Sequence, residues 1–454
     1  MCPIWPLHLV ILYLLVLMPL WVLCQQLSVT FMPVDLSLHM DDEAFANVTI
    51  NGTGLSASDT FLVSSGDEKV ATVMWNSSYQ LTEEDASSGI WNGKVKIMGN
   101  FLGRTSISIK RQSDPEPLPD KMQVTVLRPE RLIDRIFVVS VALFVSLIFI
   151  NFGCAAHWPT VRDVLKRPIG PLIGMVGQFL FMPLLSFGLG FVIFPNSAAL
   201  RLGMFFTGVS PGGGASNIWT FILGGNLNLS LAMTTLSTIA AFGLMPAWLF
   251  SLGQVVFRDA NIVVPYSRIA SFVVGLIVPM GIGLAMQKWT PRLANFMVRI
   301  LKGFSTTLLL FIIVFAIVTN LYIFELFTWE ILAAGMGIPW LGYLAGYLLA
   351  RLCRQPHADS LAISIETGVQ NTGISIFLLR YALEQPEADI TTVVPVAVAI
   401  MTPIPMTAIY IYQKISGCIS NRHQHKKIID DEINSPITES SEVEPRLATI
   451  DVDK

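Results

Sequence analysis

The stretch "SIETGVQNTGIS", which begins at Ser364, places one carboxylate and two side-chain amides inside an otherwise apolar run. Glu366 is the one acidic residue that the sequence places well inside a hydrophobic segment. Holding it there charged costs about 2.5–3.5 kcal/mol, so a bound partner is expected. The chemistry that these residue types offer is the binding of a cation by oxygen atoms.

Two glycines in this stretch, Gly368 and Gly373, weaken the helix that carries Glu366. If the helix unwinds over 367–369, backbone carbonyls become available beside the carboxylate, which suits sodium. The oxygen ligands predicted here are the side chains of Glu366 and Gln370 and the backbone around Thr367 and Val369. In the alternative interpretation, Glu366 is neutralised by hydrogen bonds or lies at an aqueous edge, and the glycines only permit close helix packing.

A second interrupted segment is "GVSPGGGASNIWTFILGGN", from Gly208 to Asn226. Pro211 removes a backbone donor and the three following glycines lower helix propensity, so two half-helices are predicted, the second beginning near Ala215. Its N-terminal amides would lie beside Ser216 and Asn217, with the positive end of the helix dipole. The glycines resemble a phosphate-binding loop, but the lysine and hydroxyl of that motif are missing.

The next segment, "NLSLAMTTLST", repeats hydroxyls at helical spacing on one face, at Ser230, Thr234 and Ser237 or Thr238. Such hydroxyls also bond to carbonyls one turn earlier, which is the structural alternative to a ligand face. Gln178, in "GMVGQFLFMPLLSFG", is one more buried amide. For Gln178, a hydrogen bond between helices and a ligand role are equally compatible with the sequence.

The composition identifies a polytopic membrane protein. Of 454 residues, 53% are hydrophobic and 13% are charged, which excludes an ordinary soluble domain. A net charge of −3 gives no reason to expect a nucleic-acid partner. The six histidines lie in the first apolar run, the predicted exterior domain, loops or the tail, and no ATP motif is present, so we expect no enzyme, no catalytic residues, no cofactor and no metal other than sodium.

The chain divides into four predicted parts. Residues 1–24 form an apolar run that we interpret as a signal peptide, with a signal anchor as the alternative. Residues 25–132 alternate with period two and predict a small all-β exterior domain, with N-glycosylation sequons at Asn47, Asn51 and Asn76. Residues 133–415 form the transmembrane domain, and residues 416–454 an acidic cytoplasmic tail that we expect to be disordered.

Nine transmembrane crossings are predicted, beginning near residues 136, 169, 198, 229, 269, 303, 331, 359 and 391. With the β domain outside, the predicted inner segments carry more lysine and arginine than the outer ones, as the positive-inside rule requires. The inner residues are Arg162, Lys166, Arg167, Lys288, Arg292, Arg299, Lys302, Arg351, Arg354, Lys414, Arg422, Lys426 and Lys427, and the outer ones are Arg201, Arg258, Arg268 and Arg380.

The two interrupted segments occupy equivalent places in the order of crossings. One is third of the first four crossings and the other is third of the last four, with a single crossing between the two groups. The second group therefore enters the membrane from the opposite side, and the halves predict an inverted repeat. Two interrupted helices that cross at the midplane are typical of a secondary-transporter site.

The motifs "PGGGASN", "LSLAMTTLST" and "ETGVQN", in this order, resemble the bile acid:sodium symporter family, solute carrier family ten, over roughly residues 135–415. The long N-terminal domain is similar to the extended-ectodomain orphan members, including ileal sodium/bile acid cotransporter-like forms. The resemblance implies a core domain with two crossed discontinuous helices that moves against a panel domain.

Carried over by position, the resemblance implies two sodium sites that share Glu366. One would use Ser216, Asn217, Ser230, Thr234 and Glu366; the other would use Gln178, Glu366, Gln370 and the backbone around Thr367 and Val369. Asn371 is placed where the family has substrate-facing polarity. The last crossing differs from the family pattern. Met401 lies near the position of an asparagine in bacterial members, and Pro403 and Pro405 follow it.

These observations favour a plasma-membrane symporter that couples sodium to an amphipathic organic anion, such as a bile acid or steroid conjugate. Two alternatives stay open. One is a cell-surface receptor or scaffold in which the β domain binds a protein partner and the helices do not transport. The other is a proton-coupled carrier that uses Glu366 alone.

Overall fold

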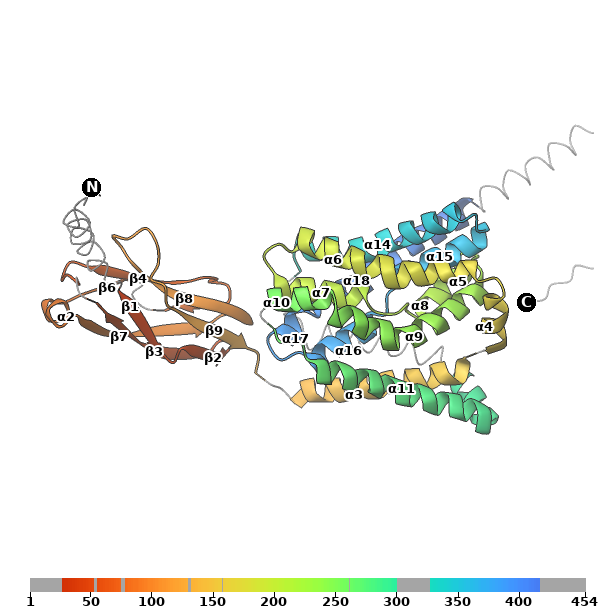
Figure 1. Ribbon diagram of the computed structural model, residues 1–454, viewed down its shortest axis with the longest axis horizontal. Coiled ribbons are helices and arrows are strands. Elements are labelled where there is room, and N and C mark those ends of the chain that lie inside the picture. Colours follow the sequence, from red (N-terminus) through yellow and green to blue (C-terminus); the bar gives the residue numbers. More distant parts are fainter. Residues whose placement is uncertain are drawn as a thin grey trace, which may run out of the picture. The chain divides into compact units, whose positions relative to one another are not determined.

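The computed structural model describes residues 27–52, 55–74, 78–129, 132–156, 158–260, 262–299 and 327–416. The first apolar run, Asn76, the crossing predicted near residue 303 and the tail from residue 417 lie outside these residues. The described chain contains a β-rich N-terminal region followed by apolar helices (Figure 1).

The β-rich region consists of two sheets, one with the strand order β1-β3-β7-β5 and one with the order β2-β9-β8-β4-β6. Neighbouring strands pair antiparallel, except that β2 and β9 are parallel. The strands are β1 (Ser28–Met32), β2 (Asp35–His39), β3 (Glu43–Asn51), β4 (Thr60–Ser65), β5 (Ala71–Val73), β6 (Ser78–Gln80), β7 (Ile90–Gly99), β8 (Gly103–Arg111) and β9 (Lys121–Leu127). Side chains from both sheets form one hydrophobic core.

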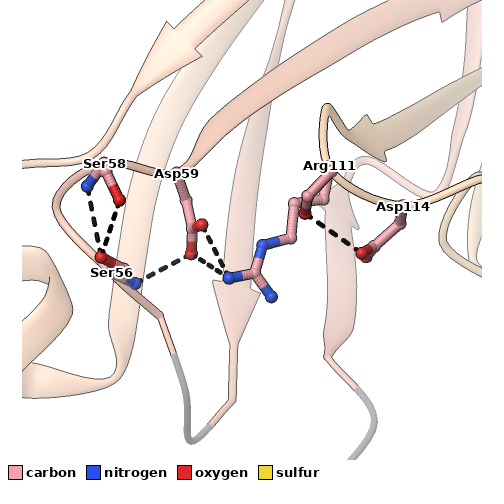
Figure 2. A network of polar contacts seen from close by, with 6 residues as sticks. Ser56, Ser58, Asp59, Arg111 and Asp114 are labelled. Carbon is pink, nitrogen blue, oxygen red and sulfur yellow. Dashed lines mark hydrogen bonds and ion pairs between the residues drawn. The ribbon is translucent and has the colours of Figure 1, made fainter.

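The alternation of side chains explains this core. In β9, Met122, Val124 and Val126 point inward and are fully buried, because every second residue of a strand faces the same side. A partly buried ion pair joins the end of β8 to the residue before β4, where Arg111 Nη2 donates to both oxygens of Asp59 at 2.7 and 2.6 Å (Figure 2). The short helix α2 (Glu83–Ser88) begins with a capping box between Thr82 and Asp85.

The helical region confirms a multi-pass membrane fold. Five helices are long and apolar enough to cross a bilayer, and a sixth is added if a bent pair counts as one span; no larger number is assigned within the described residues. The first helices are α3 (Leu132–Ala155), α4 (Trp158–Leu165), α5 (Ile169–Val176), the π-helix η1 (Gly177–Phe181) and α6 (Met182–Ile193). The next are α9 (Leu227–Phe250), α10 (Gly253–Asp259), α11 (Tyr266–Trp289), α14 (Trp329–Leu352), α17 (Glu387–Ile390) and α18 (Val393–Met401).

Two pairs of shorter helices flank interruptions in the chain. The first pair is α7 (Ala198–Gly208) and α8 (Ala215–Ile222), and the second is α15 (His357–Gly368) and α16 (Thr372–Ala382). The first interruption confirms the break predicted at Pro211 and the start of a helix at Ala215. Side chains define the start of three neighbouring helices, because Ser197, Asn226 and Asn371 each accept a hydrogen bond from a first-turn amide.

Two helix pairs pack closely enough to behave as units. Helices α3 and α11 lie side by side (Figure 1), and a Cβ atom at Gly153 or Gly283 would collide with the backbone of the other helix. Helices α14 and α15 also lie side by side. The described residues 403–416 belong to a separate unit and are helical.

Candidate ion site

The two interruptions cross each other, and each supplies hydrogen-bond partners for backbone groups of the other. Gly213 donates its N–H to the carbonyl of Val369 at 2.8 Å, and Asn371 donates its N–H to the carbonyl of Pro211 at 2.9 Å. Between these bonds, Gly212 and Gln370 form an isolated antiparallel bridge. Unwound backbone is tolerated in an apolar layer only where such partners exist, so the two breaks stabilise one another.

Glu366 lies at this crossing, in the last turns of α15, and only 2% of its surface is exposed. Its Oε2 accepts hydrogen bonds from Ser216 Oγ at 2.6 Å and from Thr234 Oγ1 at 2.9 Å, and Ser230 Oγ lies 3.5 Å away. Its Oε1 is buried and has no hydrogen-bond partner among the described residues. A Cβ atom at Gly212 would lie 2.5 Å from this Oε1, so the free oxygen faces the crossing.

Two hydroxyls of the face predicted on α9, those of Ser230 and Thr234, point at the carboxylate. Ser237 and Thr238 instead donate to the carbonyl of Thr234, which is the structural alternative. Asn217 links α9 to α8, because Ser230 Oγ donates to Asn217 Oδ1 at 2.8 Å and Asn217 Nδ2 donates to Thr234 Oγ1 at 3.2 Å.

Helix α8 begins at Ala215, one residue before Ser216. The positive end of its dipole therefore lies near the carboxylate and interacts favourably with its negative charge. The structure thus brings Ser216, Asn217, Ser230, Thr234 and Glu366 together.

Gln178 connects both broken helices. Its Nε2 donates to the carbonyl of Ser210 at 2.6 Å and to Oε1 of Gln370 at 2.8 Å. Gln370 Nε2 in turn donates to the carbonyl of Thr367 at 2.8 Å. The hydrogen bond between helices, one of the two interpretations for Gln178, is therefore present, and a ligand role stays a prediction.

A local change of helix type positions Gln178. Residues 177–181 form a single π-helical turn between α5 and α6, a distortion that is frequent at functional sites. The Trp248 indole of α9 donates to the carbonyl of Phe179 in this turn at 2.7 Å. A Cβ atom at Gly177 would lie 2.9 Å from Thr367 Oγ1, so the turn also approaches the second broken helix.

The second interruption lies later in the chain than the sequence predicts. Helix α15 continues through Gly368, and the unwound residues are 369–371 instead of 367–369. Thr367 is still helical, and its hydroxyl donates to the carbonyl of Ile363 one turn earlier at 2.8 Å. Gly368 allows the Tyr343 ring of α14 to pack directly on the backbone, so for this glycine the close-packing interpretation is correct.

Asn371 begins the second half-helix. Its Oδ1 accepts the N–H of Ile374 at 3.2 Å, which is a helix N-cap contact. This side chain is partly exposed and lies at the crossing. Its substrate-facing role stays a prediction.

A small apolar cavity lies beside the crossing. Its volume is about 10 Å³, and it reaches both interruptions, at Pro211 and near Ile374. The other residues that line it are Phe149, Thr238, Ala241, Phe242, Met245, Phe272, Val273 and Leu276. The cavity therefore lies among α3, α9, α11 and α16, which also contact one another around it.

Sequence reasoning missed two features of this site. Ser210, in the first break, and Ser375, in the first turn of α16, join the broken helices through their hydroxyls at 2.7 Å, and only their closeness to the two breaks could have suggested this. The π-helical turn has no sequence pattern of its own, because glycine and apolar residues also fit a regular helix.

Comparison with known proteins places this architecture in a family. The Sodium Bile acid symporter family matches residues 142–325. The ileal sodium/bile acid cotransporter of Cricetulus griseus is 30% identical over 292 residues, which cover 63% of this chain and 82% of the cotransporter. This chain belongs to the sodium bile acid symporter family.

Two other relatives carry different names, one of which states a transport activity and one of which does not. P3 protein of Homo sapiens is 32% identical over 272 residues, which cover 59% of this chain and 57% of that protein. The sodium-dependent organic anion transporter of Mus musculus is 33% identical over 249 residues, which cover 54% of this chain and 65% of that protein. The chain thus matches less than two thirds of the length of P3 protein.

Proposed function

We propose that this protein is a symporter that uses a sodium gradient to move an amphipathic organic anion by alternating access. The family is one of sodium-coupled transporters, as its description and the cotransporter relatives state. The observation that carries the proposal here is Glu366, a buried carboxylate with three hydroxyls on Oε2 and a free Oε1 at the crossing of two broken helices.

The proposed sodium ligands fall into two sets that share Glu366. The first set is Ser216, Asn217, Ser230, Thr234 and Glu366, which already converge through hydrogen bonds. The second set is Gln178, Glu366, Gln370 and the carbonyls of Thr367 and Val369. These two carbonyls already accept one bond each, and their second lone pairs leave room for an ion.

Sodium binding would couple to conformation because the ligands come from several helices. An ion in the first set draws α8, α9 and α15 toward one carboxylate. An ion in the second set holds η1 against α15 and the second break. Each ion therefore favours the state in which both broken helices are assembled, which is the differential interaction that coupling requires.

The proposed substrate site is the apolar cavity next to the crossing. Its lining of Phe, Met, Leu and Ile side chains suits a steroid-like skeleton, and Asn371 would supply a polar contact. The net positive charge of bound sodium ions would assist an anionic group. Among the relatives, the names of the ileal cotransporter and the organic anion transporter state substrates of this class.

The antiparallel bridge between Gly212 and Gln370 supports an inverted repeat, since two helices that enter from opposite sides meet at their breaks in this way. We retain nine crossings with the β domain outside and the C-terminus in the cytosol as part of the proposal.

The decisive experiment compares thermal stability in sodium and in equimolar potassium, for the native protein and for Glu366→Gln. A ligand that binds only the folded state raises its stability, by about 2.7 kcal/mol at a hundred times its Kd. We expect a sodium-specific rise in melting temperature in the native protein and none in Glu366→Gln.

The alternatives give different results in the same experiment. If neither form responds to sodium but flux in vesicles follows pH, Glu366 serves a proton-coupled carrier. If there is no flux and the β domain captures a protein ligand, the chain acts as a receptor or scaffold. A full sodium response in Glu366→Gln contradicts the proposed site.

A further inference from the structure

The cavity beside the ion site is too small for an amphipathic substrate in this conformation. Its volume is about 10 Å³, which is room for about one water molecule, whereas pockets for drug-sized ligands hold roughly 300–1,000 Å³. For a substrate to enter, the helices around the cavity must separate. Because α3 and α11 pack closely through Gly153 and Gly283, they are expected to move together, away from α9 and α16.

A layer of three aromatic rings links α11 to α16 beside the cavity. Phe272 of α11 lines the cavity and is buried, and its ring lies 5.4 Å from that of Phe377 on α16. Tyr381, one turn further along α16, lies 6.2 Å from Phe377 and 6.5 Å from Phe272, measured between ring centroids. The layer therefore joins the two helices that would have to separate.

An ion pair covers the aromatic layer. Arg268 lies one turn before Phe272 on the same face of α11. Its Nη1 donates to the carbonyl of Ala382, at the end of α16, at 3.2 Å, and its Nη2 donates to Glu384 Oε1 at 2.8 Å. This pair is solvent-exposed, with 46% of the Arg268 side chain and 78% of the Glu384 side chain accessible. Exposed ion pairs are weak, so the contact can break within a transport cycle.

We propose that Arg268, Phe272, Phe377, Tyr381 and Glu384 form a two-layer gate that shuts the cavity at the end where α11 begins and α16 ends. The proposed orientation makes this the exterior end. The gate deepens the proposed transport function, since opening it gives the exterior access that alternating access requires. The ion pair holds the aromatic layer shut, and separation of α11 from α16 opens both.

The test measures access to the cavity and needs neither sodium nor substrate. A reporter cysteine is placed in the cavity as Ala241→Cys, with Val273→Cys as a second reporter in case the first fails to fold. A membrane-impermeant thiol reagent is then applied to the outside of intact cells, and the rate of labelling is compared with and without Glu384→Gln. The protein lacking the reporter gives the background from its own cysteines.

We expect Glu384→Gln to raise the labelling rate about threefold, as the loss of a weak exposed pair implies. Phe272→Ala should raise it further, because it removes the aromatic layer. The control is Asp259→Asn, which breaks the Arg201–Asp259 pair between α7 and α10 at 2.7 Å. A rate that is unchanged in Glu384→Gln, or raised equally by Asp259→Asn, overturns the gate.

A second experiment locks the gate shut with a crosslink. Arg268→Cys combined with Glu384→Cys should stop labelling of the reporter under oxidising conditions, and reductant should restore it. Labelling that continues at the native rate in the crosslinked protein overturns the gate. The labelling results do not depend on sodium binding. If the labelling confirms the gate but the protein shows no thermal response to sodium, the sodium-coupled mechanism is refuted and the gate is retained.

Discussion

The hydroxyl of Ser216 lies 2.6 Å from Oε2 of Glu366, although 150 residues separate the two in the chain. This contact joins the start of one half-helix to the end of another, while Oε1 of the same carboxylate has no partner among the described residues. Oε2 of Glu366 thus joins α15 to α8 and α9 through hydrogen bonds, and Oε1 is available to an ion.

The hydroxyls on Glu366 can be tested with Thr234→Val. This substitution keeps the shape of the side chain and removes a hydrogen bond to a charged group, a contact worth about 1.5–3 kcal/mol. We expect the sodium concentration for half-maximal stabilisation to rise about tenfold or more. The control is Thr235→Val, whose hydroxyl bonds only to its own helix, and it should leave sodium binding unchanged. Equal effects in both variants would contradict a ligand role for Thr234.

Gly212 should be intolerant of any side chain. A Cβ atom there would lie 2.5 Å from Glu366 Oε1, so Gly212→Ala must displace the buried carboxylate. Overpacking of this kind costs about 1–3 kcal/mol of unfolding free energy, and we expect the sodium response to be lost as well. Gly243→Ala on α9 meets no atom within 4 Å and serves as the control. Melting curves in sodium and potassium measure both effects; a native sodium response in Gly212→Ala would exclude a site at this crossing.

Removing the Gln178 amide should loosen both broken helices. Gln178→Ala deprives the Ser210 carbonyl and Gln370 of a buried partner, which costs about 1–3 kcal/mol. Gln254→Ala removes an exposed amide contact to the Tyr266 hydroxyl and should change the unfolding free energy by no more than about 0.5 kcal/mol. Denaturation of the purified variants measures the difference. A Gln178→Ala protein as stable as the control would show that this amide does not hold the crossing together.

The β-rich region offers a test of orientation. Asn47 lies in the middle of β3, its side chain is exposed, and it begins an Asn-Val-Thr sequon. If this region is translocated, Asn47 should carry a glycan, and Asn47→Gln should remove one endoglycosidase-sensitive shift on a gel. Asn92→Gln, an exposed residue of β7 outside any sequon, should change nothing. A native protein without any such shift would place the β-rich region on the other side of the membrane or leave its sequons unused.

The sequence was sufficient to predict the β-rich region, the polytopic helices and the first break, because each follows from a local rule. Period-two alternation fixes which strand residues are buried, and Pro211 with three glycines cannot continue a helix. The partners of Glu366 were also predictable, since hydroxyls at helical spacing share one face. Family resemblance then completed the ligand sets.

The remaining features depend on contacts between distant segments. The second break lies at residues 369–371, whereas the sequence predicts 367–369, and Gly368 packs against Tyr343 within the helix. In a sequence, a glycine is equally compatible with a flexible backbone and with close packing. The Ser210–Ser375 contact and the π-helical turn at Gln178 arise only when the two breaks are assembled. No local pattern contains that information.

The mutual pairing of the two breaks has a consequence for biosynthesis. The amide of Gly213 bonds to the carbonyl of Val369, which is made much later. At a translation rate of about 5–20 residues per second, the first broken helix waits roughly 8–30 s for the second. During that interval its unwound backbone has no partner from the second break, and exposed polar backbone in lipid costs several kcal/mol per group. The nascent protein therefore needs water, the insertion machinery or a chaperone to shelter its first half until the second half has been inserted.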